Sequence, residues 1–247
     1  MPAPALPADQ GLLLQRASVV LGGARVLHDI TLHLTERRIG IIGRNGSGKS
    51  TLLRLMAGLV PADSGTVNVD GIDPMADRKA LLSRLGILFQ NPDHQILFPT
   101  VQEELAFGLI QMGQPKALAM ARVQSRLATA GRADWAGRSV ATLSQGQRQW
   151  LCLQAVLLMG PQTILLDEPL AGLDLPTQAR LTRSFDALAQ RLITITHDPA
   201  FVQAADRVIW LERGRIQADG PPAQVLPGFV AAMQHLGASD ADADLSD

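Results

Sequence analysis

The sequence has no tyrosine and one cysteine, and only 4% of its 247 residues are aromatic. A single cysteine, Cys152, excludes a disulfide within the chain, and its apolar neighbours favour a buried structural thiol. No apolar run approaches the roughly 20 residues that a membrane-spanning helix needs. The first ten residues, MPAPALPADQ, lack the basic start and apolar core of a secretory signal. We therefore expect a cytosolic chain.

The formal net charge is only −1, which argues against a nucleic-acid partner bound through a basic patch. Hydrophobic residues make up 47% of the chain, enough for one large domain or a core with a subdomain. Residues 1–10, rich in proline and alanine, are expected to be a flexible N-terminus. Residues 226–247 are expected to form a short C-terminal tail, whose last eight residues carry four aspartates.

The most informative stretch is IGIIGRNGSGKST, residues 39–51. An apolar strand leads into a glycine-rich loop, and a helix follows, which is the context that a phosphate-binding loop requires. Glycines let the backbone N–H groups point at phosphate oxygens, Lys49 adds a full positive charge, and Ser50 offers a hydroxyl to Mg²⁺. A glycine-rich turn with a chance lysine is the alternative, which the flanking strand and helix disfavour. The predicted nucleotide-binding residues are Gly43, Arg44, Asn45, Gly46, Ser47, Gly48, Lys49, Ser50 and Thr51.

The remaining pattern predicts an α/β fold with two kinds of strand. Alternating apolar and polar residues predict a small antiparallel layer within residues 12–34 and 66–69. Apolar runs at residues 39–42, 86–89, 164–166 and 192–196 predict a mainly parallel core sheet, followed by a hairpin over residues 208–218. Helices are expected at residues 76–85 and 177–190. We divide the chain into a P-loop core, residues 11–90 and 160–225, and an inserted helical subdomain, residues 91–159.

Each predicted parallel strand ends at a polar residue. Gln90, Asp167 with Glu168, and His197 follow three of these strands, and ligands bind at this edge of open α/β sheets. Asp167 is a candidate Mg²⁺ ligand, and Glu168 a candidate base for an attacking water. Gln90 could contact both Mg²⁺ and the water, and His197 could contact a terminal phosphate. Taken singly, the acidic pair could be a solvated turn and His197 a structural residue.

A further motif, LSQGQ, opens an apolar helix of the predicted subdomain. Ser144 fits an N-cap, and the N-terminus of a helix with a free serine can bind an anion. This motif lies away from the edge that carries the P-loop. It could therefore complete a phosphate site only across an interface between two molecules.

Together these motifs resemble those of the ATP-binding subunit of ABC transporters over nearly the full length of the chain. GRNGSGKST resembles Walker A, ILLDEP Walker B, LSQGQ the family signature, AGLD at residues 171–174 the D-loop, and TITHD the switch-histidine segment. The resemblance implies an ATPase that uses Mg²⁺ and works as a head-to-tail dimer. Each ATP would lie between one P-loop and the signature of the partner copy, with Asp174 at the seam. The implied signature contacts are Ser144, Gly146 and Gln147.

The segment LFQNPDHQILFPTVQEELAFGL, residues 88–109, is similar to the corresponding segment of energy-coupling-factor importers of vitamins and transition-metal ions. The resemblance implies a peripheral position on the cytoplasmic face of the cell membrane. It also implies two membrane partners, a transmembrane coupling subunit and a substrate-binding subunit, with biotin or cobalt as the first substrates to test. In this segment the apolar residues 96–98 interrupt a polar loop that would receive cytoplasmic helices of the transmembrane partner, and Glu103 and Glu104 could pair with basic residues there. The alternative is that these residues cap the subdomain's own core, and we expect a mix of both roles.

Two positions depart from the family pattern. Gln145 stands where the signature usually has the first of two glycines, and a positive φ there would strain a glutamine. No Phe, Tyr or Trp precedes Gly43, so an aliphatic side chain such as Val20 would replace the usual aromatic contact with adenine. The alternatives are a soluble ABC ATPase acting on a non-transport partner and a small-molecule P-loop kinase. The signature and switch histidine argue against the kinase.

Overall fold

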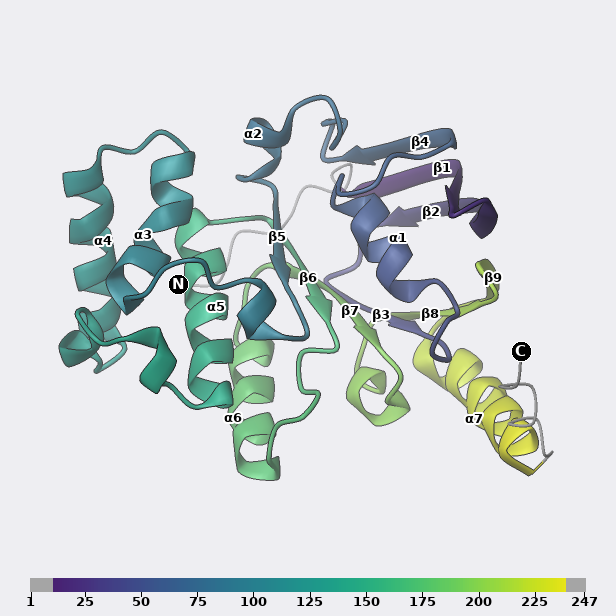
Figure 1. Ribbon diagram of the computed structural model, residues 1–247. Coiled ribbons are helices and arrows are strands. Elements are labelled where there is room, and N and C mark those ends of the chain that lie inside the picture. Colours follow the sequence, from purple (N-terminus) through teal and green to yellow (C-terminus); the bar gives the residue numbers. More distant parts are fainter. Residues whose placement is uncertain (1–10, 239–247) are drawn as a thin grey trace.

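The structure, a computed structural model, describes residues 11–238, so the expected flexible segment 1–10 and the acidic end of the chain lie outside the described part. The described chain forms two β layers and a group of helices (Figure 1). One layer is a three-stranded antiparallel sheet with the order β2-β1-β4. Its strands are β1 (Leu12–Leu21), β2 (Ala24–Leu34) and β4 (Ser64–Val69).

The second layer is a six-stranded sheet with the order β5-β6-β7-β3-β8-β9. The first five strands of this order run parallel, and only β9 is antiparallel to its neighbour. The strands are β3 (Arg38–Ile42), β5 (Leu85–Leu88), β6 (Thr163–Asp167), β7 (Arg191–Thr196), β8 (Arg207–Glu212) and β9 (Arg215–Gly220). Every residue of β7 is buried, as expected of a central strand covered on both faces. This arrangement confirms the predicted α/β fold with a mainly parallel core sheet.

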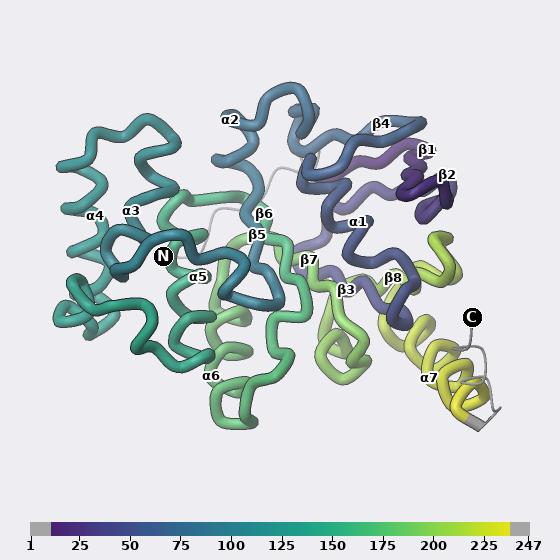
Figure 2. The backbone as a smooth tube through the Cα atoms, viewed as in Figure 1, coloured from purple at the N-terminus to yellow at the C-terminus, as the bar shows by residue number. Residues whose placement is uncertain are grey.

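Three helices stand to one side of the core sheet, at the opposite end from the antiparallel layer (Figure 1). They are α3 (Val101–Gln111), α4 (Lys116–Thr129) and α5 (Gln145–Met159). The three pack around their own apolar cluster, which includes Leu105, Val123, Leu127 and Leu151. The chain leaves the core sheet after β5 and comes back at β6, directly beside it, which Figure 2 traces.

The other helices differ in length from the expectation. Helix α1 (Lys49–Met56) follows the P-loop, and α6 (Leu175–Asp186) replaces the helix expected over residues 177–190. Helix α2 (Arg78–Leu81) has four residues, where ten were expected. It buries only Leu81, so there is little tertiary packing to stabilise a longer helix. Helix α7 (Pro222–Ala238) occupies residues 222–238, part of which the sequence analysis assigned to a tail. None of the helices within residues 11–238 is long and apolar enough to cross a membrane.

The two β layers are joined by a buried arginine, Arg191, at the start of β7. Its side chain is 1% exposed. The guanidinium donates to the backbone oxygens of Thr35 and Glu36, which follow β2 in the chain, at 3.1 and 3.2 Å. It also donates to Thr163 Oγ1 of β6 at 3.2 Å. It also lies 4.0 Å from Asp70 Oδ1, just past β4. Burial raises the pKa of Asp70, and Arg191 opposes that rise. One side chain therefore connects elements of both sheets.

We predict that Arg191→Met lowers the free energy of unfolding by about 3–5 kcal/mol, because it leaves the buried Asp70 carboxylate without its cation. Urea denaturation measures the loss. Arg25→Met, on an exposed position of β2, is the matched control and should change stability by no more than about 0.5 kcal/mol. A loss of less than about 1 kcal/mol for Arg191→Met would show that this side chain does not link the two layers.

Candidate functional site

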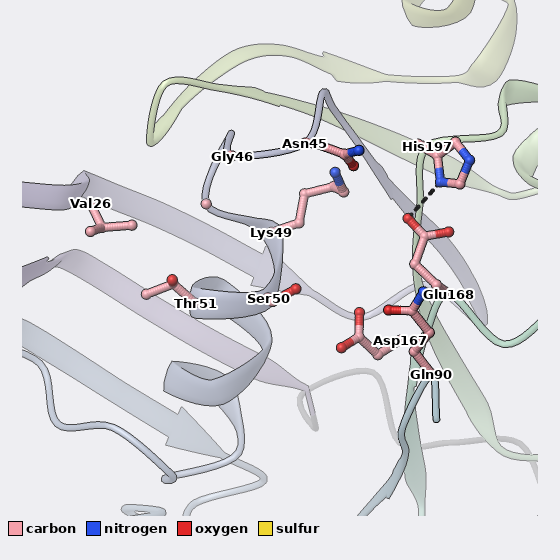
Figure 3. Close-up of a pocket in the computed structure, with 11 residues that line it drawn as sticks. Val26, Asn45, Gly46, Lys49, Ser50, Thr51, Gln90, Asp167, Glu168 and His197 are labelled. Carbon is pink, nitrogen blue, oxygen red and sulfur yellow. Dashed lines mark hydrogen bonds and ion pairs between the residues drawn. The ribbon is translucent and has the colours of Figure 1, made fainter. Parts of the chain in front are cut away.

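A cavity of about 440 Å³ opens at the carboxyl ends of the parallel strands. Polar side chains from four strand ends line it, as Figure 3 shows. The lining residues are Val26, Asn45, Gly46, Gly48, Lys49, Ser50, Thr51, Gln90, Asp167, Glu168 and His197. The four strand ends singled out in the sequence therefore meet in one place. Gly43, Arg44 and Ser47, also predicted site residues, belong to the same loop, between β3 and α1.

The loop depends on glycines at defined positions. A Cβ added to Gly43 would lie 2.2 Å from the backbone oxygen of Leu211 and 2.6 Å from Ser47 Oγ, so no side chain fits there. Gly46 and Gly48 have φ of +78° and +102°, which L-residues with side chains rarely adopt. Lys49 Nζ donates to the backbone oxygens of Gly43 and Arg44, at 2.7 and 2.8 Å. The side chain of Lys49 therefore folds back over the P-loop.

Charged groups of opposite sign, Lys49 and the carboxyl groups of Asp167 and Glu168, line the cavity. Burial lowers the pKa of Lys49, and the carboxylates of Glu168, Asp167 and Glu212 act against that shift. Burial and the neighbouring Glu168 raise the pKa of Asp167, while Arg54 and Lys49 act against that rise. Two partly buried carboxyl groups thus face one buried ammonium, an arrangement that a bound cation would stabilise.

The three predicted Mg²⁺ ligands, Ser50, Gln90 and Asp167, line the same cavity. They supply a hydroxyl, an amide and a carboxylate oxygen, the hard oxygen donors that Mg²⁺ prefers. Within residues 11–238 no group of three or more His, Cys, Asp or Glu side chains could hold a metal ion by itself. The donor set therefore fits an ion that is held partly by protein and partly by phosphate, as Mg²⁺ is in nucleotide sites.

Glu168 and His197 are in direct contact. Glu168 Oε1 lies 2.9 Å from His197 Nδ1, and the side chains are 13% and 63% exposed. Glu168 has φ of +43°, in the left-handed region that costs a residue with a side chain free energy. Such outliers are concentrated at functional sites.

The predicted signature residues Ser144, Gly146 and Gln147 do not line this cavity, and neither does Asp174. Ser144 caps α5, and Ser144 and Gln147 form a reciprocal capping box. Asp174 caps α6 by accepting from the backbone N–H of Thr177 at 2.8 Å. Ser144, Asp174 and the following Leu175 are exposed, Leu175 by 78%. One copy of the chain therefore brings together only part of the predicted site.

One detail corrects the sequence analysis, and a second adds to it. Gln145 is the first residue of α5 and is not among the residues with positive φ, so the glutamine in the signature carries no such strain. The apolar side chain at the cavity is Val26 of β2, whereas Val20 lies at the end of β1 and is 37% exposed. Val26 lies in β2, beyond the tight turn Gly22-Gly23, and its backbone oxygen would lie 3.3 Å from a Cβ added to Gly48 of the P-loop. The sequence analysis did not single it out, and contact of adenine with Val20 stays a prediction.

The segment after Gln90 is held from within the subdomain. Glu104 is 5% exposed, and its Oε2 accepts the backbone N–H groups of Leu97 and Phe98 at 2.9 and 3.0 Å. Leu97 itself is 68% exposed. Of the two roles considered for Glu104, these contacts favour the internal one. Helix α5 holds the same segment through the Arg148–Asp93 ion pair, at 3.1 Å.

Comparisons with known proteins agree with this geometry. The family model described as ABC transporter matches residues 27–171. The chain is 56% identical to the biotin transport ATP-binding protein BioM of Rhodobacter capsulatus, covering 87% of this chain and 92% of the relative. It is 35% identical to the energy-coupling factor transporter ATP-binding protein EcfA1 of Streptococcus thermophilus, over 81% and 74% of the chains. The solved structure of cbiO1 from Clostridium perfringens, part of the ABC transporter complex cbiONQ, matches with a TM-score of 0.76 and 28% identity, over 92% and 95% of the chains.

We predict that Gly43→Ala weakens nucleotide affinity at least about tenfold, because the added methyl group would push the loop away from the backbone of Leu211. Isothermal titration with ATP measures the affinity. Gly137→Ala is the matched control, since a Cβ at Gly137 meets no atom within 4 Å. Equal affinities in the two variants would contradict the assignment of this loop.

Proposed function

The chain belongs to the ABC transporter family, and from that premise we propose that it is the ATP-binding and ATP-hydrolysing subunit of an energy-coupling-factor importer. The observation that carries the proposal is the single cavity in which the P-loop, Asp167, Glu168, Gln90 and His197 meet. The similarity to EcfA1 supports the importer class.

The residues of the cavity suit hydrolysis of ATP by a positioned water. The N–H groups of the P-loop and the ammonium of Lys49 bind the phosphates, and Ser50, Gln90 and Asp167 would hold Mg²⁺. When bound, Mg²⁺ neutralises charge that develops on the phosphate oxygens. Glu168 takes a proton from the attacking water. The water oxygen forms a bond to the γ-phosphorus, the bond from that phosphorus to the bridging oxygen breaks, and its electron pair leaves with ADP. His197 contacts the terminal phosphate from the same edge.

The incomplete site supports a head-to-tail homodimer. Ser144, Gly146 and Gln147 lie outside the cavity, at the exposed N-terminus of α5, where backbone N–H groups favour an anion. A second copy would bring these residues to the phosphates bound by the first. Asp174 and the highly exposed Leu175 would lie at the seam, where burial of Leu175 contributes apolar contact.

The names of the relatives support a proposal for the cargo and the membrane partners. The 56% identity to a biotin transport protein over most of both chains supports biotin as the first cargo to test. We therefore place the chain on the cytoplasmic face of the membrane, bound to a transmembrane coupling subunit and a substrate-binding subunit. The exposed Leu97, within the segment similar to energy-coupling-factor importers, is the position where the coupling subunit would make contact.

We predict that Glu168→Gln keeps ATP affinity within about threefold and lowers turnover by at least about a hundredfold, because an amide cannot take up the proton. The variant should also accumulate as a dimer in ATP, as measured by size-exclusion chromatography. Lys49→Ala is the comparison, since it should lose ATP binding itself. If Glu168→Gln hydrolyses ATP at the wild-type rate, Glu168 is not the base.

Biotin import is tested in the source cell by deleting the gene in a strain that depends on external biotin. Growth on trace biotin should fail, and the wild-type gene should restore it. Lys49→Ala should not restore growth. If the deletion strain still accumulates labelled biotin at the normal rate, biotin is not the cargo. If Lys49→Ala restores growth, import does not depend on ATP binding at this P-loop.

A further inference from the structure

Thr196, the last residue of β7, also contacts Glu168, although neither the motif pattern nor the cavity lining singled it out. Its side chain is nearly buried, with the residue 4% exposed. Thr196 Oγ1 lies 3.2 Å from Glu168 Oε2, while the next residue, His197, contacts Oε1 of the same carboxylate. Two consecutive residues at one strand end therefore contact the two oxygens of Glu168 separately.

The direction of the Thr196 hydrogen bond follows from its second contact. The backbone N–H of Asp198 points at Thr196 Oγ1 over 3.1 Å, and an N–H group can only donate. The hydroxyl therefore accepts there, and its single proton is directed at Glu168 Oε2. An ionised carboxylate only accepts, so the two groups match. Oε2 is engaged by a donor from a buried residue. Oε1 contacts the exposed ring of His197 and has a second lone pair, which remains available for proton exchange.

The hydroxyl is itself held by a rigid frame. Asp198 caps the short helix η4 (Pro199–Val202) through Oδ1, which accepts from the N–H of Ala200 at 2.9 Å. Val202 of that helix packs on the P-loop strand so closely that a Cβ at Gly40 would lie 2.7 Å from it. The donor to Glu168 is thus fixed relative to the strand that carries the phosphate loop.

The backbone of Glu168 is attached to β7, the strand that ends at Thr196. Its N–H donates to the backbone oxygen of Ile195 at 2.9 Å, in a conformation with φ of +43°. The backbone does not fix the terminal torsion of a glutamate side chain, which has a broad rotational preference. A hydrogen bond to one carboxylate oxygen removes that freedom. In Figure 3 the oxygen that contacts His197 lies on the side of Asn45 and Lys49.

We propose that Thr196 is a positioning residue of the ATPase reaction. Its hydroxyl holds Oε2 of Glu168, so that Oε1 faces the attacking water and takes its proton. The proton passes from water to Oε1 as the water oxygen bonds to the γ-phosphorus and ADP leaves, so Thr196 keeps its own proton throughout. This inference rests on the proposed role of Glu168 and adds to it the residue that selects which oxygen reacts.

The test compares Thr196→Val, which removes the hydroxyl and keeps the shape, with Thr196→Ser, which keeps the hydroxyl. Steady-state ATP hydrolysis and ATP affinity are measured on the full chain. Thr196→Val should lower kcat at least about tenfold, because a misplaced base loses reaction geometry, while ATP affinity changes less than about twofold. Thr196→Ser should stay within about threefold of wild type. Thr194→Val, two residues earlier on the same strand, is the control and should leave kcat unchanged.

A double variant separates positioning from general damage. In the Glu168→Gln background, Thr196→Val should produce no further loss of turnover, because the group that it positions is already inactive. An additional tenfold loss there would overturn the proposal, as would Thr196→Ser failing to restore kcat. If Thr196→Val does not fold, Thr196→Ala replaces it, and equal turnover by Thr196→Ala and wild type would also overturn the proposal.

The same experiments distinguish this inference from the proposed function. Wild-type turnover by Glu168→Gln would refute the role of Glu168 itself. A large loss in Glu168→Gln together with a normal kcat in Thr196→Val would refute only the role of Thr196. A fall in melting temperature that accounts for the loss of turnover in Thr196→Val would show a structural role and overturn positioning.

Discussion

The parallel pairing of β3, β6 and β7 is the constraint on which the site depends. In this register Ile42 pairs with Thr196, and Asp167 pairs with Ile195. The carboxyl ends of parallel strands lie at the same edge of the sheet, so the residues that follow these strands are close together as a result of strand pairing alone. A shift of one residue in any pair would turn the side chains to the other face of the sheet. The geometry between phosphate loop, acidic pair and histidine is thus set by backbone pairing in a buried sheet.

Much of the core could be predicted because its signals are local. The apolar run before Gly43, the glycines of the loop and the polar residue after each apolar strand are visible in short stretches of sequence. The helix α7 was missed because Pro227 and Gly228 suggest a break in the chain. It forms because Val225 and Phe229 are buried against the core, with the Phe229 ring 5.6 Å from that of Trp210. Tertiary packing overrides local propensity there.

The site was predicted less completely than the fold, for a related reason. Lys49, Asp167 and Glu168 belong to patterns with fixed spacing, and the structure gathers them. Val26 and Thr196 contribute through contacts with residues far away in the sequence, and a valine or threonine in a strand is typical of any sheet. The signature residues show the opposite case, because Ser144 has a clear motif and yet stands apart from the cavity in a single copy.

The buried carboxylate of Glu104 has a consequence for how the molecule meets other proteins. The carboxylate accepts the backbone N–H groups of Leu97 and Phe98 and is buried, so this negative charge is not exposed on the surface beside the Leu97 side chain. A contact made at Leu97 therefore gains no ion pair from Glu104, and the exposed leucine contributes apolar area to it. The apolar part of such a contact keeps its strength when ionic strength changes, since screening acts on exposed charges and leaves hydrophobic burial nearly untouched.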